Sequence, residues 1–301
     1  MESKLTLAET IKEIIREHLE KNNGLLLGQC ISAVGWVNGT VPNIEGIVEL
    51  PMTDVSGAGI AVGIAMTGRR PIFVVRFQDF MILNGSPLIN YAAKCKELHN
   101  RSVPVFIRAI ASEGLGPVHS GVLHSIFMHF PGFKVCSPMT PGEYREIWKD
   151  YMGGDDPMYV SEHRESFKNA EEFEDVIIPD ADITLYGISS TRFHLREVAE
   201  RLKVTGIECN IIHLFWLKPL KLEEKKLTPL KQSGLGLVID ASFEICGASR
   251  SIAYELSNIT GCKVKALGLQ DHTKCLCSPL QNKSPDAEVI IDKVVELVKQ
   301  N

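Results

Sequence analysis

Apolar residues along this chain fall into two alternating patterns, short continuous runs and longer segments with helical spacing. The first helical segment spans residues 5–24. Its apolar positions are Leu7, Ile11, Ile14, Ile15 and Leu19. Thr6 and Glu9 predict a capping box at the start of this helix, and Gly24 predicts its end.

Short apolar runs separated by helical patterns continue through the first half of the chain. The runs predict strands at residues 25–28, 46–50, 71–77, 103–110, 133–138 and 157–163. The segments between them predict helices at residues 56–68, 86–98, 121–130 and 141–152. Strands that alternate with helices predict a parallel sheet that carries helices on both faces.

Residues 164–180 are polar and charged and predict a linker, after which the alternation begins again. Strands are predicted at residues 183–188, 207–214, 235–240 and 262–269, and helices at residues 191–206 and after Gly247. A last helix is predicted with Ser284 as N-cap and Pro285 at the first helical position. The expected fold class is α/β with two domains, residues 1–175 and 180–301.

The bulk composition narrows the class of protein further. Hydrophobic residues make up 45% of the chain and charged residues 23%, which is typical of a globular protein. The formal net charge of −5 argues against a nucleic acid or an anionic membrane as partner. No apolar run approaches the ~20 residues of a membrane span, and the opening MESKLTLAET lacks a signal-peptide core. We expect a cytoplasmic protein.

The eight cysteines are scattered along the sequence, several of them within apolar runs. This distribution predicts buried, reduced thiols. The exception is the C-x-C pair of Cys275 and Cys277, a weak zinc signal because no second pair lies nearby. We therefore predict no metal site within this chain.

Gly57, Gly59 and Gly63 match a dinucleotide-binding fingerprint only superficially. Their spacing is G-x-G-x-x-x-G, and no acidic residue ends a second strand ~20 residues later. Together with Ala61 and Ala65 they favour a helix that packs closely against another backbone. A helix of this kind suits burial on more than one side, which indicates a subunit interface.

Asp54, Asp79 and His119 are the candidate chemical groups. By residue type alone, Asp54 is the N-cap of the helix that follows it, and Asp79 has the same interpretation. His119 lies in a Gly/Pro-rich loop between a strand and a helix, where a single histidine is more often structural than catalytic. His124 and His129 follow at i+5 and i+10, which does not suit one metal site, because helical ligand pairs need closer spacing.

Several segments, in the same order and spacing, resemble one family. They are LPMTDVSGAGIAVGIAMTGRRPIFVVRFQDFM, VPVFIRAIASEGLGPVHS, HFPGFKVCSPMTP and DDPMYVSEHR. The family is that of the β subunits of thiamine-diphosphate-dependent 2-oxoacid dehydrogenases, of the pyruvate and branched-chain type. DADITLYGISSTRFHLREVAERL, IIHLFWLKPLK and LGLVIDASFEICGASRSIAYEL are similar to the transketolase C-terminal domain. The resemblance covers nearly the whole chain and implies that the first domain is a pyrimidine-binding module.

The resemblance also implies a partner. In this family a separate α subunit carries the diphosphate module, with a G-D-G…N-N signature that binds magnesium. The nearest segment here, GGDDP at residues 153–157, lacks that order. Thiamine diphosphate is therefore expected between two subunits, with Mg²⁺ held by the α-type subunit, in an α2β2 heterotetramer. A lipoyl acyltransferase core is a further partner that the dehydrogenase version of the family implies.

The site residues that the resemblance implies follow position by position. Asp54 falls where the family has a glutamate that hydrogen-bonds the aminopyrimidine ring. In the family, that ring then removes the proton from the thiazolium carbon. Phe80 falls at the aromatic position that packs on the pyrimidine, Phe77 supports it, and Met52 is a hydrophobic contact before the acid. His119 matches a histidine that lines the substrate side and exchanges protons with intermediates. Asp54 and His119 are thus the expected catalytic residues.

Aspartate in place of glutamate shortens the reach of the acid by one C–C bond, ~1.5 Å. That departure, and EICGAS where relatives often have a Gly-Gly pair, leave three functions open. The first is decarboxylation of a 2-oxoacid with acyl transfer to a lipoyl group. The second is transketolase-like or carboligase chemistry in a biosynthetic pathway. The third is a non-catalytic subunit that keeps the fold and the interface.

Overall fold

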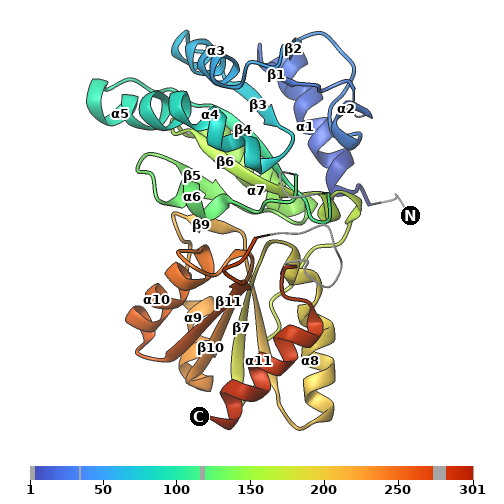
Figure 1. Cartoon of the computed structure of the whole chain (residues 1–301), viewed down its shortest axis with the longest axis vertical. Helices are drawn as coiled ribbons and strands as arrows, with labels where there is room; N and C mark the ends of the chain where they lie inside the picture. The colour runs from blue at the N-terminus through green and yellow to red at the C-terminus, as the bar shows by residue number, and fades with distance from the viewer. Residues whose placement is uncertain (1–3, 34, 116–118, 274–282, 301) are drawn as a thin grey trace. The chain divides into compact units, whose positions relative to one another are not determined.

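The computed structural model describes residues 4–33, 35–115, 119–273 and 283–300. The chain divides into two compact units, Met1–Glu172 and Phe173–Asn301 (Figure 1). Each unit is built on a parallel sheet, as the alternation of strands and helices predicted. The segment predicted as a linker contains more structure than expected, because it includes a 3-10 helix, Arg164–Lys168 (η3).

Parallel strands form the sheet of the first unit in the order β2-β1-β3-β4-β6-β5. The strands are Leu25–Gln29 (β1), Ile47–Leu50 (β2), Pro71–Val75 (β3), Phe106–Ala111 (β4), Lys134–Cys136 (β5) and Met158–His163 (β6). Each overlaps a predicted strand. Every residue of β3, β4 and β6 is buried, as expected for parallel strands that helices cover on both faces.

Helices cover this sheet in two groups, in which α1 packs on α7 and α3 packs on α4 (Figure 1). They are Leu7–Lys21 (α1), Asp54–Met66 (α3), Met81–Pro87 (α4), Ala93–His99 (α5), His124–Met128 (α6) and Pro141–Gly153 (α7). The predicted capping box of α1 is confirmed, because Thr6 accepts from the Glu9 N–H and Glu9 accepts from the Thr6 N–H, at 3.3 and 2.8 Å. The helix predicted at residues 86–98 begins earlier, at Met81, and contains a π-helical turn, Leu88–Ala92 (η2).

A short left-handed segment after β1 has no counterpart in the predicted elements. Gly35, Trp36, Val37 and Asn38 (α2) have φ angles of 59°, 52°, 54° and 57°. Left-handed backbone costs roughly 1–2 kcal/mol for each residue other than glycine. Burial of the Val37 side chain helps to offset that cost. Hydrophobic spacing carries no signal for such a turn.

The second unit has a sheet of parallel strands in the order β11-β10-β7-β8. The strands are Ile183–Ile188 (β7), Cys209–Leu214 (β8), Leu235–Phe243 (β10) and Lys263–Leu269 (β11), and the helices are Leu195–Val204 (α8), Glu224–Ser233 (α9), Ala248–Thr260 (α10) and Ala287–Lys299 (α11). Apolar side chains from α8, α11 and all four strands form one buried cluster. The strand predictions are confirmed, and β10 extends further than expected.

Several details of the second unit differ from the predictions. The last helix begins at Ala287, and its N-cap is Asp286, whose side chain accepts from the Val289 N–H at 3.1 Å. The prediction of Ser284 as N-cap is therefore wrong, because an aspartate caps a helix as well as a serine and stands next to the apolar stripe. The helix predicted from residue 191 begins only at Leu195.

Two short elements were not predicted at all. The helix α9 contains Pro229 and is mostly polar, and strand Trp216–Lys218 (β9) is too short to show an alternating pattern.

The cysteine predictions are partly confirmed. Cys95, Cys136 and Cys209 are buried and form no disulfide, whereas Cys246 is exposed. Cys275 and Cys277 lie outside the described residues. Within the described part of the chain, no helix combines the length and the apolar character that crossing a bilayer requires.

A buried ion pair joins β4 to β6 in the core of the first unit. Arg108 Nε and Nη2 donate to the two carboxylate oxygens of Glu162, each at 2.7 Å, and neither side chain is exposed. Tyr144 Oη donates to the same carboxylate at 2.8 Å, and Arg108 Nη2 also donates to Thr40 Oγ1 at 2.9 Å. Burial alone would lower the pKa of Arg108, but the Glu162 carboxylate outweighs it and raises that pKa. Arg108 therefore stays charged.

We predict that Arg108→Met lowers the free energy of unfolding by about 3–5 kcal/mol, because it leaves the Glu162 carboxylate buried without its partner. Urea titration of the full chain measures the change. Arg108→Met combined with Glu162→Gln should recover part of the loss, because no unpaired charge remains. As a control, Lys4→Met removes an exposed pair with Glu171 and should cost much less, because water and salt screen an exposed ion pair. The prediction would be contradicted if Arg108→Met lowered the free energy of unfolding no more than the Lys4→Met control does.

Candidate functional site

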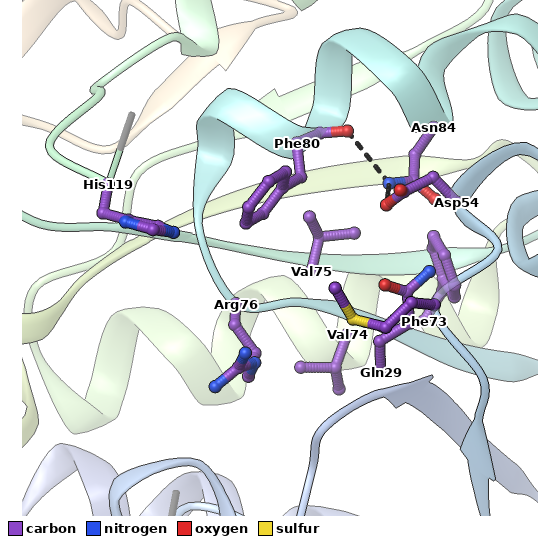
Figure 2. A pocket seen from close by; sticks show the side chains of 10 residues that line it. Gln29, Asp54, Phe73, Val74, Val75, Arg76, Phe80, Asn84 and His119 are labelled. Atoms are coloured by element: carbon purple, nitrogen blue, oxygen red, sulfur yellow. Dashed lines mark hydrogen bonds between the residues drawn. The ribbon is translucent and has the colours of Figure 1, made fainter. Parts of the chain in front are cut away.

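A cavity of about 140 Å³ lies at the carboxyl ends of β1 and β3 (Figure 2). Ligands of open parallel sheets bind at this edge. The cavity is lined by Gln29, Met52, Asp54, Phe73, Val74, Val75, Arg76, Phe80, Asn84 and His119. Four of the five residues expected at a site from the sequence, Met52, Asp54, Phe80 and His119, are therefore brought together. The fifth, Phe77, is not among the lining residues, but its ring packs against that of His119.

The Asp54 carboxylate is held by an asparagine that the sequence analysis did not identify. Asp54 is the first residue of α3, and Thr53 is the N-cap, so the interpretation of Asp54 as N-cap is wrong. Its Oδ1 instead accepts a hydrogen bond from Asn84 Nδ2 at 3.0 Å. The same Nδ2 donates to the Phe80 carbonyl at 2.9 Å, which fixes the orientation of the Asn84 amide (Figure 2).

The start of α3 is capped by a residue of the neighbouring strand. Thr53 makes no capping bond with its own side chain. With its amide oxygen turned toward them, Gln29 at the end of β1 accepts from the Thr53 and Asp54 N–H groups at 3.1 and 3.0 Å. Gln29 therefore ties the start of α3 to the carboxyl end of β1 and determines where Asp54 stands.

Two acceptor atoms at this end of the cavity lack partners among the described residues. Asn84 is 2% exposed, and its Oδ1 is buried without a hydrogen bond. The second carboxylate oxygen of Asp54 makes no hydrogen bond to any described side chain or N–H group either. Burial closes Asn84 Oδ1 off from the cavity, whereas Asp54 is half-buried and lines it, so the second Asp54 oxygen can hydrogen-bond the edge of a ligand.

Aromatic rings form the wall between this end and His119. The His119 ring lies 4.2 Å from the Phe77 ring and 5.5 Å from the Phe80 ring, centroid to centroid. Met52 is 70% exposed, and its sulfur lies 3.8 Å from Cys30 Sγ at the mouth of the cavity. Phe80, Phe73, Val74 and Val75 make the walls apolar, so the cavity combines apolar walls with polar ends.

The loop that carries His119 is held in place by two side chains of the 3-10 helix Gln78–Phe80 (η1). Asp79 accepts from the Gly121 N–H at 3.0 Å, so its interpretation as an N-cap is also wrong. Gln78 is fully buried and accepts from the Leu123 N–H at 2.6 Å. At the other end of the loop, Ser112 Oγ donates to the His119 carbonyl at 2.5 Å. These contacts position the His119 backbone.

This arrangement suits a flat heteroaromatic ring. An apolar cavity of about 150 Å³ in another protein accommodates benzene, so the volume here fits one six-membered ring. The walls can stack on its faces, and the free oxygen of Asp54 can hydrogen-bond its edge. The residues present thus fit the aminopyrimidine part of thiamine diphosphate. Gln29, Asn84 and Arg76 were missed because they belong to no motif and only the fold brings them together.

Comparison with protein families gives two matches. Residues 45–169 match the family "Transketolase, pyrimidine binding domain", and residues 175–273 match "Transketolase, C-terminal domain". The first match contains every cavity residue except Gln29.

Several curated relatives are named as beta subunits. The chain is 27% identical to the 2-oxoisovalerate dehydrogenase subunit beta of Bacillus subtilis, over 73% of this chain and 75% of the relative. It is 27% identical to the acetoin:2,6-dichlorophenolindophenol oxidoreductase subunit beta of Cupriavidus necator, over 85% of each chain. It is 25% identical to the pyruvate dehydrogenase E1 component subunit beta of Staurastrum punctulatum, over 99% of each chain.

Solved structures show the same fold. A split-gene transketolase, described as an inactive beta4 tetramer, superposes with a TM-score of 0.77 at 17% identity over 99% of both chains. Transketolase from Campylobacter jejuni superposes with a TM-score of 0.73 at 18% identity, over 97% of this chain and 46% of that one.

The contact between Asp79 and Gly121 gives a prediction that needs no assay of activity. Asp79→Ala should speed amide exchange at Gly121 by about 10- to 100-fold, because a hydrogen bond to a charged acceptor is lost. Hydrogen exchange of the loop, followed by mass spectrometry, measures this. Asp155→Ala, at an exposed carboxylate, is the control and should leave the loop unchanged. Equal exchange in both variants would mean that Asp79 does not hold the loop.

Proposed function

This chain belongs to the transketolase-like superfamily of thiamine-diphosphate-dependent enzymes, and on that premise we propose that it is the β-type half of a two-subunit enzyme acting on a 2-oxoacid. The observation that carries the proposal is a cavity that Asp54 lines and whose volume fits one aromatic ring. The β subunits among its relatives support the β-type assignment.

Asp54, Asn84 and Phe80 would hold the pyrimidine end of the cofactor. Thiamine diphosphate, when bound, supplies a nucleophilic carbon and an electron sink for cleaving the bond next to a keto carbon. The free oxygen of Asp54 would hydrogen-bond a ring nitrogen, with one proton shared between the carboxyl group and the ring, and Asn84 would hold the carboxyl group through its Nδ2. Phe80 and Met52 would pack on the ring and exclude water.

The short side chain of Asp54 is the main departure from the family pattern. A displacement near 1 Å can cost about a hundredfold in rate, so the missing ~1.5 Å of reach has to be recovered. Gln29 ties the start of α3 to β1, and Asn84 holds the carboxylate at the cavity. We propose that these two contacts place Asp54 for the role that glutamate has in the family.

His119 would move protons on the substrate side. Its carbonyl is bound by Ser112, while neither ring nitrogen hydrogen-bonds to another described residue. Phe77 packs against the ring and holds its plane. A neutral imidazole nitrogen in this position can accept a proton from the substrate and return it.

The exposed outer face of α3 is an argument for a partner subunit. Val55 is 54% exposed and Ile60 47% exposed, and a Cβ built on Gly59 or Gly63 meets no atom within 4 Å. Such a face allows close approach of another backbone. Its continuation on α4 carries Ile82 and Leu83, which are also exposed. We propose that an α-type subunit with the diphosphate module and Mg²⁺ packs here, in an α2β2 heterotetramer.

Alternatives remain within the same superfamily. Transketolase-like or carboligase chemistry would use the same cavity, and aspartate in place of glutamate is the observation that keeps this version open. A non-catalytic subunit would keep the exposed face of α3 without the function of Asp54. The lipoyl acyltransferase core and the cytoplasmic location stay predictions.

Calorimetry tests the proposal directly. We expect thiamine diphosphate with Mg²⁺ to bind the assembled pair, and Asp54→Ala to weaken binding at least about tenfold, because the acceptor for the ring is lost. Asp292→Ala, at an exposed carboxylate of α11, is the control. Unchanged affinity in Asp54→Ala, or equal binding by this chain without a partner, would count against the proposal.

A second prediction concerns the interface alone. Gly63→Leu should leave this chain as stable as the wild type or slightly more stable, because glycine within a helix costs roughly 0.5–1 kcal/mol and the new side chain meets open space. It should nevertheless abolish assembly with the partner in size-exclusion chromatography. Gly153→Leu, in equally open space at the end of α7, is the matched control. Assembly that survives Gly63→Leu would place the partner elsewhere.

A further inference from the structure

Arg76 lines the cavity without an acidic partner of its own. It follows β3 directly and is half-buried. None of its guanidinium N–H groups donates a hydrogen bond to a described residue, and no described carboxylate lies within the 4.0 Å of an ion pair. A half-buried cation of this kind is costly unless an anion pairs with it.

One acid that lies close enough to sense the charge of Arg76 uses its oxygens elsewhere. Glu49 accepts from the Ile31 N–H at 2.7 Å, and from the N–H and the hydroxyl of Ser32, both at 3.0 Å. Burial would raise the pKa of Glu49, but these hydrogen bonds and the charge of Arg76 outweigh it and lower that pKa. Glu49 therefore senses the charge of Arg76 but uses its oxygens to hold the loop after β1.

A second guanidinium lies beside the first. Arg164 lies over the Phe77 ring with its Cζ 4.5 Å from the ring centroid, and Arg76 Cζ lies 5.6 Å from the same centroid. Arg164 Nη2 donates to the Arg76 carbonyl at 3.2 Å, while its Nε is buried without a partner. Burial, and then the charge of Arg76, lower the pKa of Arg164. Two cations are thus packed around one ring with no ion-paired acid among the described residues.

The charges of the cavity are separated. Figure 2 shows Asp54 and Asn84 to the right of Phe80, His119 to its left, and Arg76 below it with its guanidinium pointing away from Asp54. An anion would be repelled at the Asp54 end and attracted at the Arg76 end. The planar guanidinium fork matches a carboxylate or a phosphate with two parallel hydrogen bonds. The Arg76 end is also the side of His119, where the substrate is expected.

We propose that Arg76 binds an anionic group of the substrate that is remote from the reacting carbonyl, with Arg164 as its positioning residue. The inference rests on the proposed function. A cation fixed beside the carboxylate that leaves as CO2 would stabilise the ground state more than the transition state and slow the reaction. The anion at Arg76 is therefore a second one, either a carboxylate or a phosphate, at the far end of the keto substrate.

Kinetics of the assembled pair test this with matched substrates. 2-Oxoglutarate is compared with 2-oxobutyrate for a second carboxylate, and fructose 6-phosphate with fructose for a phosphate. We expect one charged substrate to be preferred in kcat/KM, and Arg76→Gln to reduce that preference by about 10- to 100-fold, as for a lost charge-assisted hydrogen bond. Arg76→Lys should restore part of it. Arg16→Gln, on the exposed surface of α1, is the control for removal of one positive charge.

Binding measurements keep the inference separate from the proposed function. Inorganic phosphate and succinate are titrated into the pair by calorimetry, with wild type and Arg76→Gln. Loss of anion binding in the variant supports the inference even if neither keto substrate is turned over. Three results would overturn it: no preference for a charged substrate together with no anion binding, an equal preference in wild type and Arg76→Gln, or a variant that loses affinity for thiamine diphosphate but not for thiamine.

Discussion

The hydrogen bond from Asn84 to Asp54 is the contact on which the account of this site depends. An aspartate reaches less far than the glutamate of the family pattern, so its usefulness depends on where the backbone stands and how the carboxylate is turned. Gln29 fixes the position of the backbone by capping α3, and Asn84 fixes the orientation of the carboxylate. Because Asn84 also binds the Phe80 carbonyl, the acid and the aromatic wall form one rigid unit at the edge of the sheet.

Rigidity of the sheet makes such short-range positioning effective. The Arg108–Glu162 pair joins β4 to β6, and Gln78 ties η1 to the Ala109 carbonyl of β4 and to Ser161 of β6. The loop of His119 is bound to the same η1 through Asp79 and Gln78. The same set of buried strands therefore supports both the Asp54 end and the His119 end of the cavity, although these residues lie far apart in the sequence.

Much of the fold could be predicted, and part of the site. Strands and helices with strong apolar patterns, such as α1 and β3, follow from local sequence. The left-handed turn at Trp36 and Val37 could not be predicted, because its cost is met by packing that only the fold creates. Asp54 and His119 were recognised through a family resemblance, but residue type alone assigned Asp54 to an N-cap. Asn84 and Arg76 carry no local signal, since their importance arises from neighbours that are distant in the sequence.

A crystal structure of this chain assembled with its partner and thiamine diphosphate is the most direct test of the central claim. The account predicts that a ring nitrogen of the aminopyrimidine lies within hydrogen-bond distance of Asp54, with Phe80 against the face of the ring and the diphosphate held by the other subunit. A carboxylate turned away from the ring, or a pyrimidine bound outside the cavity between β1 and β3, would contradict it.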